Sequence, residues 1–331
     1  MELNIASIEI EPKRHTFGHI AERFGEDRPA SRYEEAIYDG QATENFHYRP
    51  QWEPEFEIYD VRRTKIVMSD WYKLLDPRKF HYMSYVSTRA KDNSTSEQNF
   101  EFIEKRGLVS KITQANKNKI YKYLTSLRHY EYGANLNNLT IVSRGYGTAL
   151  DSASLFYATD SLGMAQHITK IILLVSDNDV SKLDEGKNDW LNDSMWQGLR
   201  KALEDILIIK DPIELLIAQN VIFDGMVLPL LINNFAKEMA DNGEITIGML
   251  TEFITSWQEE TVKWLDSIVK VMAEESVENK SLLEQWSSKY MSIIYDALEE
   301  PSKYSLNAEE ILSSLRNDLI LRLNKNCLLN I

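Results

Sequence analysis

The chain has 331 residues, of which 43% are hydrophobic, so it can form one large domain or two modest ones. Its 51 acidic residues outnumber its 37 basic residues and give a formal net charge of −14, which disfavours binding to nucleic acid or to anionic membranes. The single cysteine, Cys327, excludes an internal disulfide or a cysteine-based metal cluster and is typical of a reducing compartment.

The N-terminus lacks a basic start followed by an apolar run, so no signal peptide is expected. No apolar stretch approaches the ~20 residues that span a bilayer. The sequence therefore predicts a soluble, cytoplasmic protein.

Residues 1–75 are predicted to form a mostly irregular arm. Five of the eight prolines fall in the first 77 residues, and proline restricts its own backbone and that of the residue before it. The first 60 residues also contain nine aromatic residues, whereas disordered segments are poor in them. Such an arm needs an apolar surface, either on its own helical domain or on another subunit. The candidate contacts with another subunit are Phe46, His47, Tyr48, Arg49 and Trp52.

From residue 76 onward the pattern predicts one all-α domain over 76–331. Asp76 and Pro77 suit an N-cap and a first helical position, and Ser194 with Gln197 suits a capping box. Apolar residues recur at spacings of three and four, the mark of one helix face. Helices are predicted at 77–105, 110–145, 148–176, 194–209, 212–241, 246–274, 281–298 and 307–324. Long helices joined by short links indicate a helical bundle.

The sequence contains few motifs that indicate metal binding or catalysis. A bundle can hold two irons with a Glu from each of two helices and Glu-x-x-His from each of two others. Among the six histidines, only His47 has a glutamate three positions before it, Glu44, and this pair lies in the proline-rich arm. His129 and His167 lack such an acid and are interpreted as structural. No glycine-rich phosphate loop or nucleophile elbow occurs.

Six stretches share their order and spacing with one known family. They are SRYEEAIYD at 31–39, NFHYRPQWEP at 45–54, DWYKLLDPRKFHYMSYVSTRA at 70–90, LRHYEYGANLNN at 127–138, DWLNDSMWQGLRKALED at 189–205 and AQNVIFDGMVLPLL at 218–231. Together they resemble the β subunit of the hydroxylase in bacterial multicomponent monooxygenases, in the phenol hydroxylase branch. The resemblance covers nearly the whole chain and implies a ferritin-like helical bundle.

The resemblance also implies partners and cofactors. The hydroxylase of this family is a dimer of α, β and γ subunits, and its di-iron centre lies in the related α subunit. Electrons from NADH arrive through a separate reductase that carries FAD and a 2Fe–2S cluster, and a small regulatory protein docks on the complex. No cofactor is expected in the chain itself.

Compared with the α-type pattern, the metal positions of this chain are degenerate. Glu131 matches the first Glu, because it lies 30 residues before Ser161 in the stretch FYATDSLGMAQHITKI. Asp160 matches the Asp, but Ser161 stands where a bridging Glu would be and Met164 where the His would be. In the second half, Trp257 or Gln258 falls at the Glu position, Glu260 or Thr261 at the His position, and Phe223 or Asp224 at the fourth carboxylate. The surviving candidate oxygen ligands are Glu131, Asp224 and Glu260.

The resemblance and these losses lead to one expectation and two alternatives. The expectation is a non-catalytic structural β subunit that supports a di-iron α subunit, with Glu131 buried and hydrogen-bonded to an arginine or a tyrosine. The first alternative is a metal-binding ferritin-like protein that uses Glu131, Asp224 and Glu260. The second is a free-standing helical scaffold without an α partner.

Overall fold

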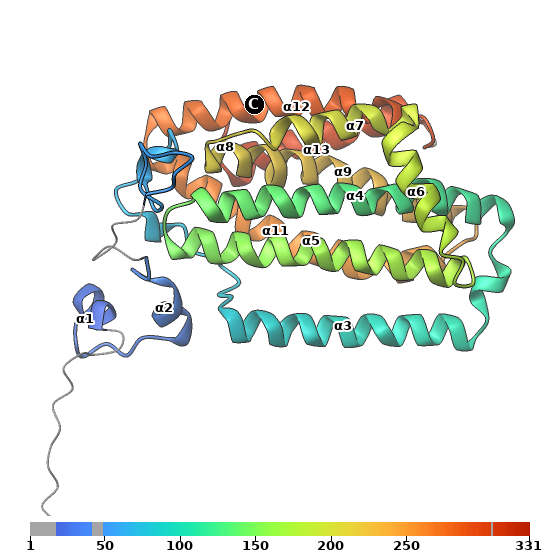
Figure 1. Cartoon of the computed structure of the whole chain (residues 1–331), viewed down its shortest axis with the longest axis horizontal. Coiled ribbons are helices and arrows are strands. Elements are labelled where there is room, and N and C mark those ends of the chain that lie inside the picture. The colour runs from blue at the N-terminus through green and yellow to red at the C-terminus, as the bar shows by residue number, and fades with distance from the viewer. Residues whose placement is uncertain (1–17, 42–48, 306) are drawn as a thin grey trace, which may run out of the picture.

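The computed structural model describes residues 18–41, 49–305 and 307–331. Every regular element in these ranges is a helix, and none of these residues forms a strand. Figure 1 shows the long helices running side by side along the longest axis of the molecule, with α6 crossing near one end. The predicted all-α, ferritin-like bundle is therefore confirmed.

The elements follow in chain order. They are α1 (Gly18–Phe24), α2 (Arg32–Ile37), the 3-10 turns Val61–Arg63 and Trp71–Lys73, α3 (Tyr82–Lys105), the 3-10 turn Leu108–Lys111, α4 (Gln114–Arg144), α5 (Thr148–Val175), α6 (Ser181–Asn192), α7 (Ser194–Ile206), α8 (Pro212–Leu216), a π-helical segment Ile217–Phe223, α9 (Asp224–Leu228), a second π-helical segment Pro229–Asn234, α10 (Phe235–Asp241), α11 (Thr246–Glu275), α12 (Val277–Ser302) and α13 (Ala308–Asn326).

The segment Pro212–Asp241, here called the central helix, is one continuous helical run from α8 to α10 and carries both π-helical segments. Its mean hydropathy over an 18-residue window is 1.9, so by length and composition it could cross a membrane. The expectation that no stretch approaches this length is therefore wrong. Because 89% of that window is buried inside the bundle, its apolar character is that of a core helix in a soluble protein.

Several helices begin at residues other than those predicted, because local turns precede them. α3 begins at Tyr82 instead of 77, since the Asp76 carboxylate accepts the Arg78 backbone N–H at 2.9 Å and Lys79 adopts a left-handed φ of 55°. α4 begins at Gln114 instead of 110, because residues 108–111 form a 3-10 turn. The break expected near Gly145 and Gly147 separates α4 from α5.

Two features around α6 were not predicted correctly. α6 itself has no counterpart among the predicted helices. The capping box of Ser194 and Gln197 is also wrong, because the N-cap of α7 is Asp193, whose carboxylate accepts the Met195 N–H at 2.9 Å. The Gln197 amide instead donates to the carbonyls of Trp190 and Asp193.

The described part of the arm packs on one end of its own bundle. Tyr33 of α2 is buried with Tyr72 and Ala149, and its hydroxyl accepts the Asp76 N–H at 2.9 Å. Further along the arm, the buried Glu53 pairs with Arg63 and with Arg144 at the end of α4. Within residues 18–41 and 49–75, the arm thus contains two short helices and two 3-10 turns, with irregular backbone between them.

Candidate functional site

Four helices carry the positions that the sequence singled out. α4 supplies Glu131, α5 supplies Ser161 and Met164, the central helix supplies Asp224, and α11 supplies Glu260. The first four are almost completely buried, and the charges of Glu131 and Asp224 lie close enough to influence each other. The Glu260 side chain is 30% exposed and contacts a different residue, Arg89. The structure therefore separates Glu260 from the other two candidate carboxylates.

Asp224 is the centre of a buried hydrogen-bond network. Its carboxylate accepts the Tyr130 hydroxyl at 2.6 Å, the Tyr157 hydroxyl at 2.7 Å and the Gln219 amide at 2.8 Å. Burial raises the pKa of Asp224 to about 6, and the three hydrogen bonds oppose part of that rise. Three donors on one carboxylate leave it little capacity to bind a cation as well.

Glu131 is buried beside this network but does not join it. Burial, together with the nearby charge of Asp224, raises the pKa of Glu131 well above its usual value and so favours its protonated form. No described residue donates a hydrogen bond to its Oε1 atom. The predicted burial is observed, whereas the predicted hydrogen bond from an arginine or a tyrosine is not found at this atom.

Arg89 of α3 binds two acidic residues, Asp160 of α5 and Glu260 of α11. Its Nε and Nη2 atoms contact the two Asp160 oxygens at 2.9 and 2.8 Å, and Nη1 contacts Glu260 at 2.8 Å. The Tyr85 hydroxyl donates to Asp160 at 2.8 Å, and the guanidinium lies 4.4 Å from the Trp257 ring centroid. Sequence reasoning missed Arg89, because only the tertiary fold brings α3 against α5 and α11.

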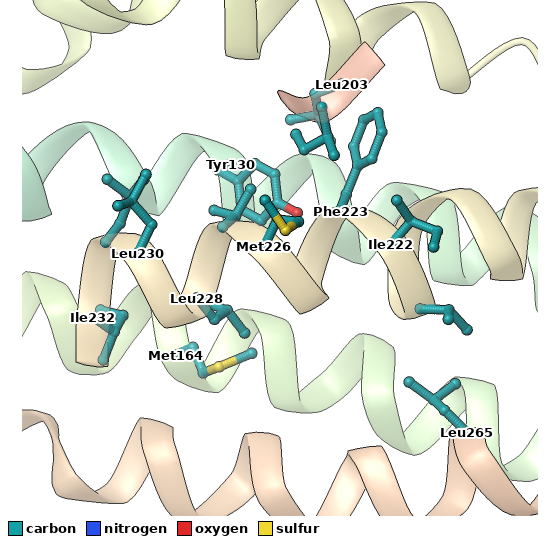
Figure 2. Close-up of a cluster of buried hydrophobic side chains, with 14 of the residues drawn as sticks. Tyr130, Met164, Leu203, Ile222, Phe223, Met226, Leu228, Leu230, Ile232 and Leu265 are labelled. Atoms are coloured by element: carbon teal, nitrogen blue, oxygen red, sulfur yellow. The ribbon is translucent and has the colours of Figure 1, made fainter. Parts of the chain in front are cut away.

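The other positions carry groups of low metal affinity. Figure 2 shows Met164 projecting from α5 toward Leu228 of the central helix, within an apolar cluster. The hydroxyls of Ser161 and Thr261 are buried and have no hydrogen-bond partner among the residues that the structure describes. In the part of the chain that the structure describes, no group of three or more His, Cys, Asp or Glu residues is placed to hold a metal ion.

The two helical histidines have structural surroundings. His167 Nε2 lies 2.9 Å from the Leu250 carbonyl oxygen, and its ring meets Phe100 edge-on. His129 stacks on Trp190 at a centroid distance of 6.2 Å. Burial lowers the pKa of His129 to about 4, with a further contribution from Arg128, so its ring is neutral at neutral pH.

A second polar cluster joins α4 to the first π-helical segment. Asn138 and Asn220 exchange two amide hydrogen bonds of 3.0 and 2.8 Å, and the Asn137 amide donates to Gln219 at 2.7 Å. All four side chains are buried. The sequence signal was the adjacent pair Asn137 and Asn138 within a helix, but the amide partners of these two residues lie 82 positions away.

The predicted partner contacts in the arm fall into two groups. Phe46, His47 and Tyr48 lie outside the described residues. Arg49 pairs with Glu57 at 2.6 Å on the surface, and Trp52 is 74% exposed. An exposed indole of this size is available to a partner, so the predicted role of Trp52 stays a prediction.

Comparison with known proteins identifies the family. The family model described as Methane/Phenol/Alkene Hydroxylase matches residues 52–276. The chain is 40% identical over 298 residues to the oxygenase component DmpL of phenol 2-monooxygenase from Pseudomonas sp. (strain CF600), with 90% of each chain covered. The chain belongs to the methane, phenol and alkene hydroxylase family.

Two further members of the hydroxylase family support this placement. The solved structure of phenol hydroxylase from Pseudomonas sp. OX1 has a TM-score of 0.89 and 39% identity, covering 97% of each chain. The subunit beta of the toluene-4-monooxygenase hydroxylase component from Ectopseudomonas mendocina is 19% identical over 253 residues, which are 76% of this chain and 74% of that one. The resemblance drawn from the sequence, including its phenol hydroxylase branch, is confirmed.

The residues at the metal positions do not fit the di-iron centre that the resemblance implies for this family. Such a centre needs bridging carboxylates to balance its charge and imidazoles to complete its coordination. Ser161 offers a neutral hydroxyl, and Met164 offers a soft thioether that suits iron poorly among oxygen ligands. Asp224 is already held by three donors, and Arg89 neutralises Asp160.

Proposed function

We propose that this chain is the non-catalytic, structural β subunit of a phenol-type multicomponent monooxygenase hydroxylase. In this role it holds the catalytic α subunit in place and shapes the surface on which partner proteins dock. The observation that carries the proposal is the altered donor set, in which Ser161 and Met164 replace two ligands and Arg89 takes up Asp160 and Glu260. Family membership and the match to a phenol 2-monooxygenase oxygenase component support the same assignment.

The proposal extends to the rest of the complex. The di-iron centre belongs to α, and FAD and the 2Fe–2S cluster belong to a separate reductase, so this chain binds none of them. Its partners are the α and γ subunits in a dimer of αβγ, and the reductase and a small regulatory protein dock on the assembly. The proposed location is the cytoplasm, which accords with the central helix being buried inside the bundle.

The test measures metal in the isolated chain. The chain, purified alone, is incubated with Fe(II) without oxygen, freed of unbound metal, and analysed for iron by mass spectrometry. We expect far less than one iron per chain, because Asp224 already accepts three hydrogen bonds, Arg89 pairs with Asp160 and Glu260, and Ser161 and Met164 are poor ligands for iron. The intact hydroxylase, treated identically, is the positive control.

Two outcomes would count against the proposal. About two irons per isolated chain, with the absorption of a di-iron centre, would favour the metal-binding ferritin-like protein instead. Full turnover by the other hydroxylase subunits without this chain would show that it supports nothing in the complex. We expect that turnover to fall sharply and to return when the chain is added back.

A further inference from the structure

The outer face of α4 and α5 has an unusual composition for a surface. Its exposed large residues are apolar and are 36% to 54% exposed. They are Tyr132, Leu136 and Leu139 on α4 and Leu155 and Leu162 on α5. Thr159 and Gln166 are the other exposed residues of α5 in the same stretch. Surface helices of soluble proteins normally present charged residues on this side.

Charge is absent from this face over several helical turns. Within 129–143 of α4 and 152–169 of α5, Glu131 and Asp160 are the only Asp, Glu, Lys or Arg residues, and both are buried. At one end of the stretch, the Arg128 Nη1 atom lies 3.4 Å from the Thr169 hydroxyl oxygen. At the other end, the next charged residues along the two helices are Arg144 and Asp151. In a chain with a net charge of −14, a charge-free face of this length needs an explanation.

A groove continues the face toward α3. It has a volume of about 630 Å³ and is lined by Val86 and Ala90 of α3, Leu162 and Gln166 of α5, and Phe253 of α11, among others. Figure 1 shows α4, α5 and α3 following one another across the molecule. The charged residues of the groove are already paired, Arg89 with Asp160 and Lys170 with Glu97. Leu162 and Gln166 belong to both the face and the groove, so the two form one surface.

The size of this surface suits a stable subunit interface. At 1.5 Å per residue, 18 residues of α5 extend for about 27 Å, and two packed helices are about 20 Å wide. The two helices alone therefore present roughly 500 Å², and the groove with the start of α3 brings the surface toward the ~800 Å² per partner of a standard interface. Tyr82, Met83 and Val86 at the start of α3 are exposed and apolar.

We infer that this surface, made of the α4 and α5 outer face and the adjoining groove, is where a larger helical subunit of the same hydroxylase docks. The inference rests on the proposed function and names the interface that the function requires. A charge-free face can be buried without leaving an unpaired ion, and it allows an acidic chain to bind a partner without bringing like charges together. The groove fits a ridge of side chains from a partner helix.

The test introduces one negative charge into the surface. Leu139→Glu and Leu162→Glu change exposed residues, so the isolated chain should keep its circular dichroism spectrum and melt within a few degrees of the wild type. In the assembled complex the new carboxylate would be buried without a partner, so co-purification with the co-expressed hydroxylase subunits should fall on the order of tenfold or more. Leu191→Glu on α6 is the matched control, because Leu191 and Leu139 are both 41% exposed, and it should assemble like the wild type.

A second measurement uses the unaltered chain and so does not depend on the folding of a variant. Hydrogen exchange should be compared between the free chain and the assembled hydroxylase. Assembly should bring new protection to peptides spanning 132–139 and 155–166, and none around 187–192.

Assembly of both face variants at wild-type levels, or equal exchange in the two states, would overturn the inference. Sedimentation of the isolated chain as a dimer that Leu139→Glu dissociates would also overturn it, because the occupant would then be a second copy. If the wild-type chain does not co-purify at all, the proposed function fails and the inference with it.

Discussion

Ser161 is predicted to match the position of a bridging ligand in the α-type pattern, and its buried hydroxyl has no hydrogen-bond partner among the described residues. Asp224, on the neighbouring central helix, has a carboxylate that accepts the hydroxyls of Tyr130 and Tyr157. Both residues now belong to the packing of the bundle. Their environments lead to separate expectations for stability.

Replacing Ser161 with alanine should leave the free energy of unfolding unchanged or raise it by up to about 1 kcal/mol. A buried hydroxyl without a partner has lost its hydrogen bonds to water and gained none, so its removal relieves that penalty. Ser126→Ala is the control, because the Ser126 hydroxyl donates to the Gly186 carbonyl at 3.1 Å and its loss should cost about 1 kcal/mol. Urea unfolding measures both variants, and turnover of the assembled hydroxylase with Ser161→Ala should stay within about twofold. An equal loss of stability in the two variants would contradict this account.

Asp224 should make the folded chain less stable as the pH rises from about 4 to about 6. Its pKa is about 6 in the folded chain against a usual value of 3.8, so between these values the folded chain binds more protons than the unfolded chain. The free energy of unfolding therefore falls across this window, by up to about 3 kcal/mol, and stays lower above it. Asp224→Asn cannot titrate, so unfolding curves from pH 4 to 7 should show its stability improving relative to the wild type as the pH rises. Parallel pH curves for the two proteins would disprove the assignment.

At the scale of elements, the central helix combines an apolar surface with a polar line of contact to α4. The pairs Asn138–Asn220 and Asn137–Gln219 join α4 to the π-helical segment Ile217–Phe223. A π-helical turn shifts the side chains that follow it around the helix axis. The amide pairs can therefore form in only one register of the central helix against α4. The apolar side chains alone would not specify that register.

Asn138→Leu should cost about 1–3 kcal/mol of stability, because it leaves the buried Asn220 amide without its partner. The double variant Asn138→Leu, Asn220→Leu removes both amides and should be more stable than the sum of the single changes indicates. Denaturant unfolding of the four proteins in the cycle measures this coupling. Asn192→Leu on α6 breaks an exposed amide pair with Asn188 and should change stability by less than about 0.5 kcal/mol. Additive losses in the cycle would show that the buried pair is not coupled.

For the molecule as a whole, the arm and the bundle are connected more closely than their sequence patterns indicate. Glu53 lies between Arg63 of the arm and Arg144 of α4, and Trp71 is buried against Tyr146. Exposed aromatic surface on the described arm is limited, and Trp52 is its most exposed large hydrophobic residue. Trp71 therefore reports on the packing of the arm against the bundle, and Trp52 reports on its proposed contact with a partner.

Trp52→Ala should leave the stability of the isolated chain within about 0.5 kcal/mol of the wild type, because the side chain is 74% exposed. The same change should weaken co-purification with the other hydroxylase subunits, since a tryptophan at an interface is typically worth ~2 kcal/mol or more. Trp71→Ala is the comparison and should cost about 3–5 kcal/mol of stability, because it empties a buried site. Calorimetry of the isolated chains and pull-down of the complex give the two readouts. Undiminished assembly of Trp52→Ala would remove this residue from the interface.

The sequence by itself determined the helical class, the positions of most long helices, the family, and the absence of Glu-x-x-His from the helical domain. These properties depend on residue identity and on spacings of three and four, which act within one helix. Only the tertiary structure decided that Arg89 binds Asp160 and Glu260, that Asp224 is held by two tyrosines, and that no described residue donates to Glu131 Oε1. It also decided which apolar residues of α4 and α5 face outward. The partners of these side chains lie tens to hundreds of positions away along the chain, and only the packing of helices against one another brings them together.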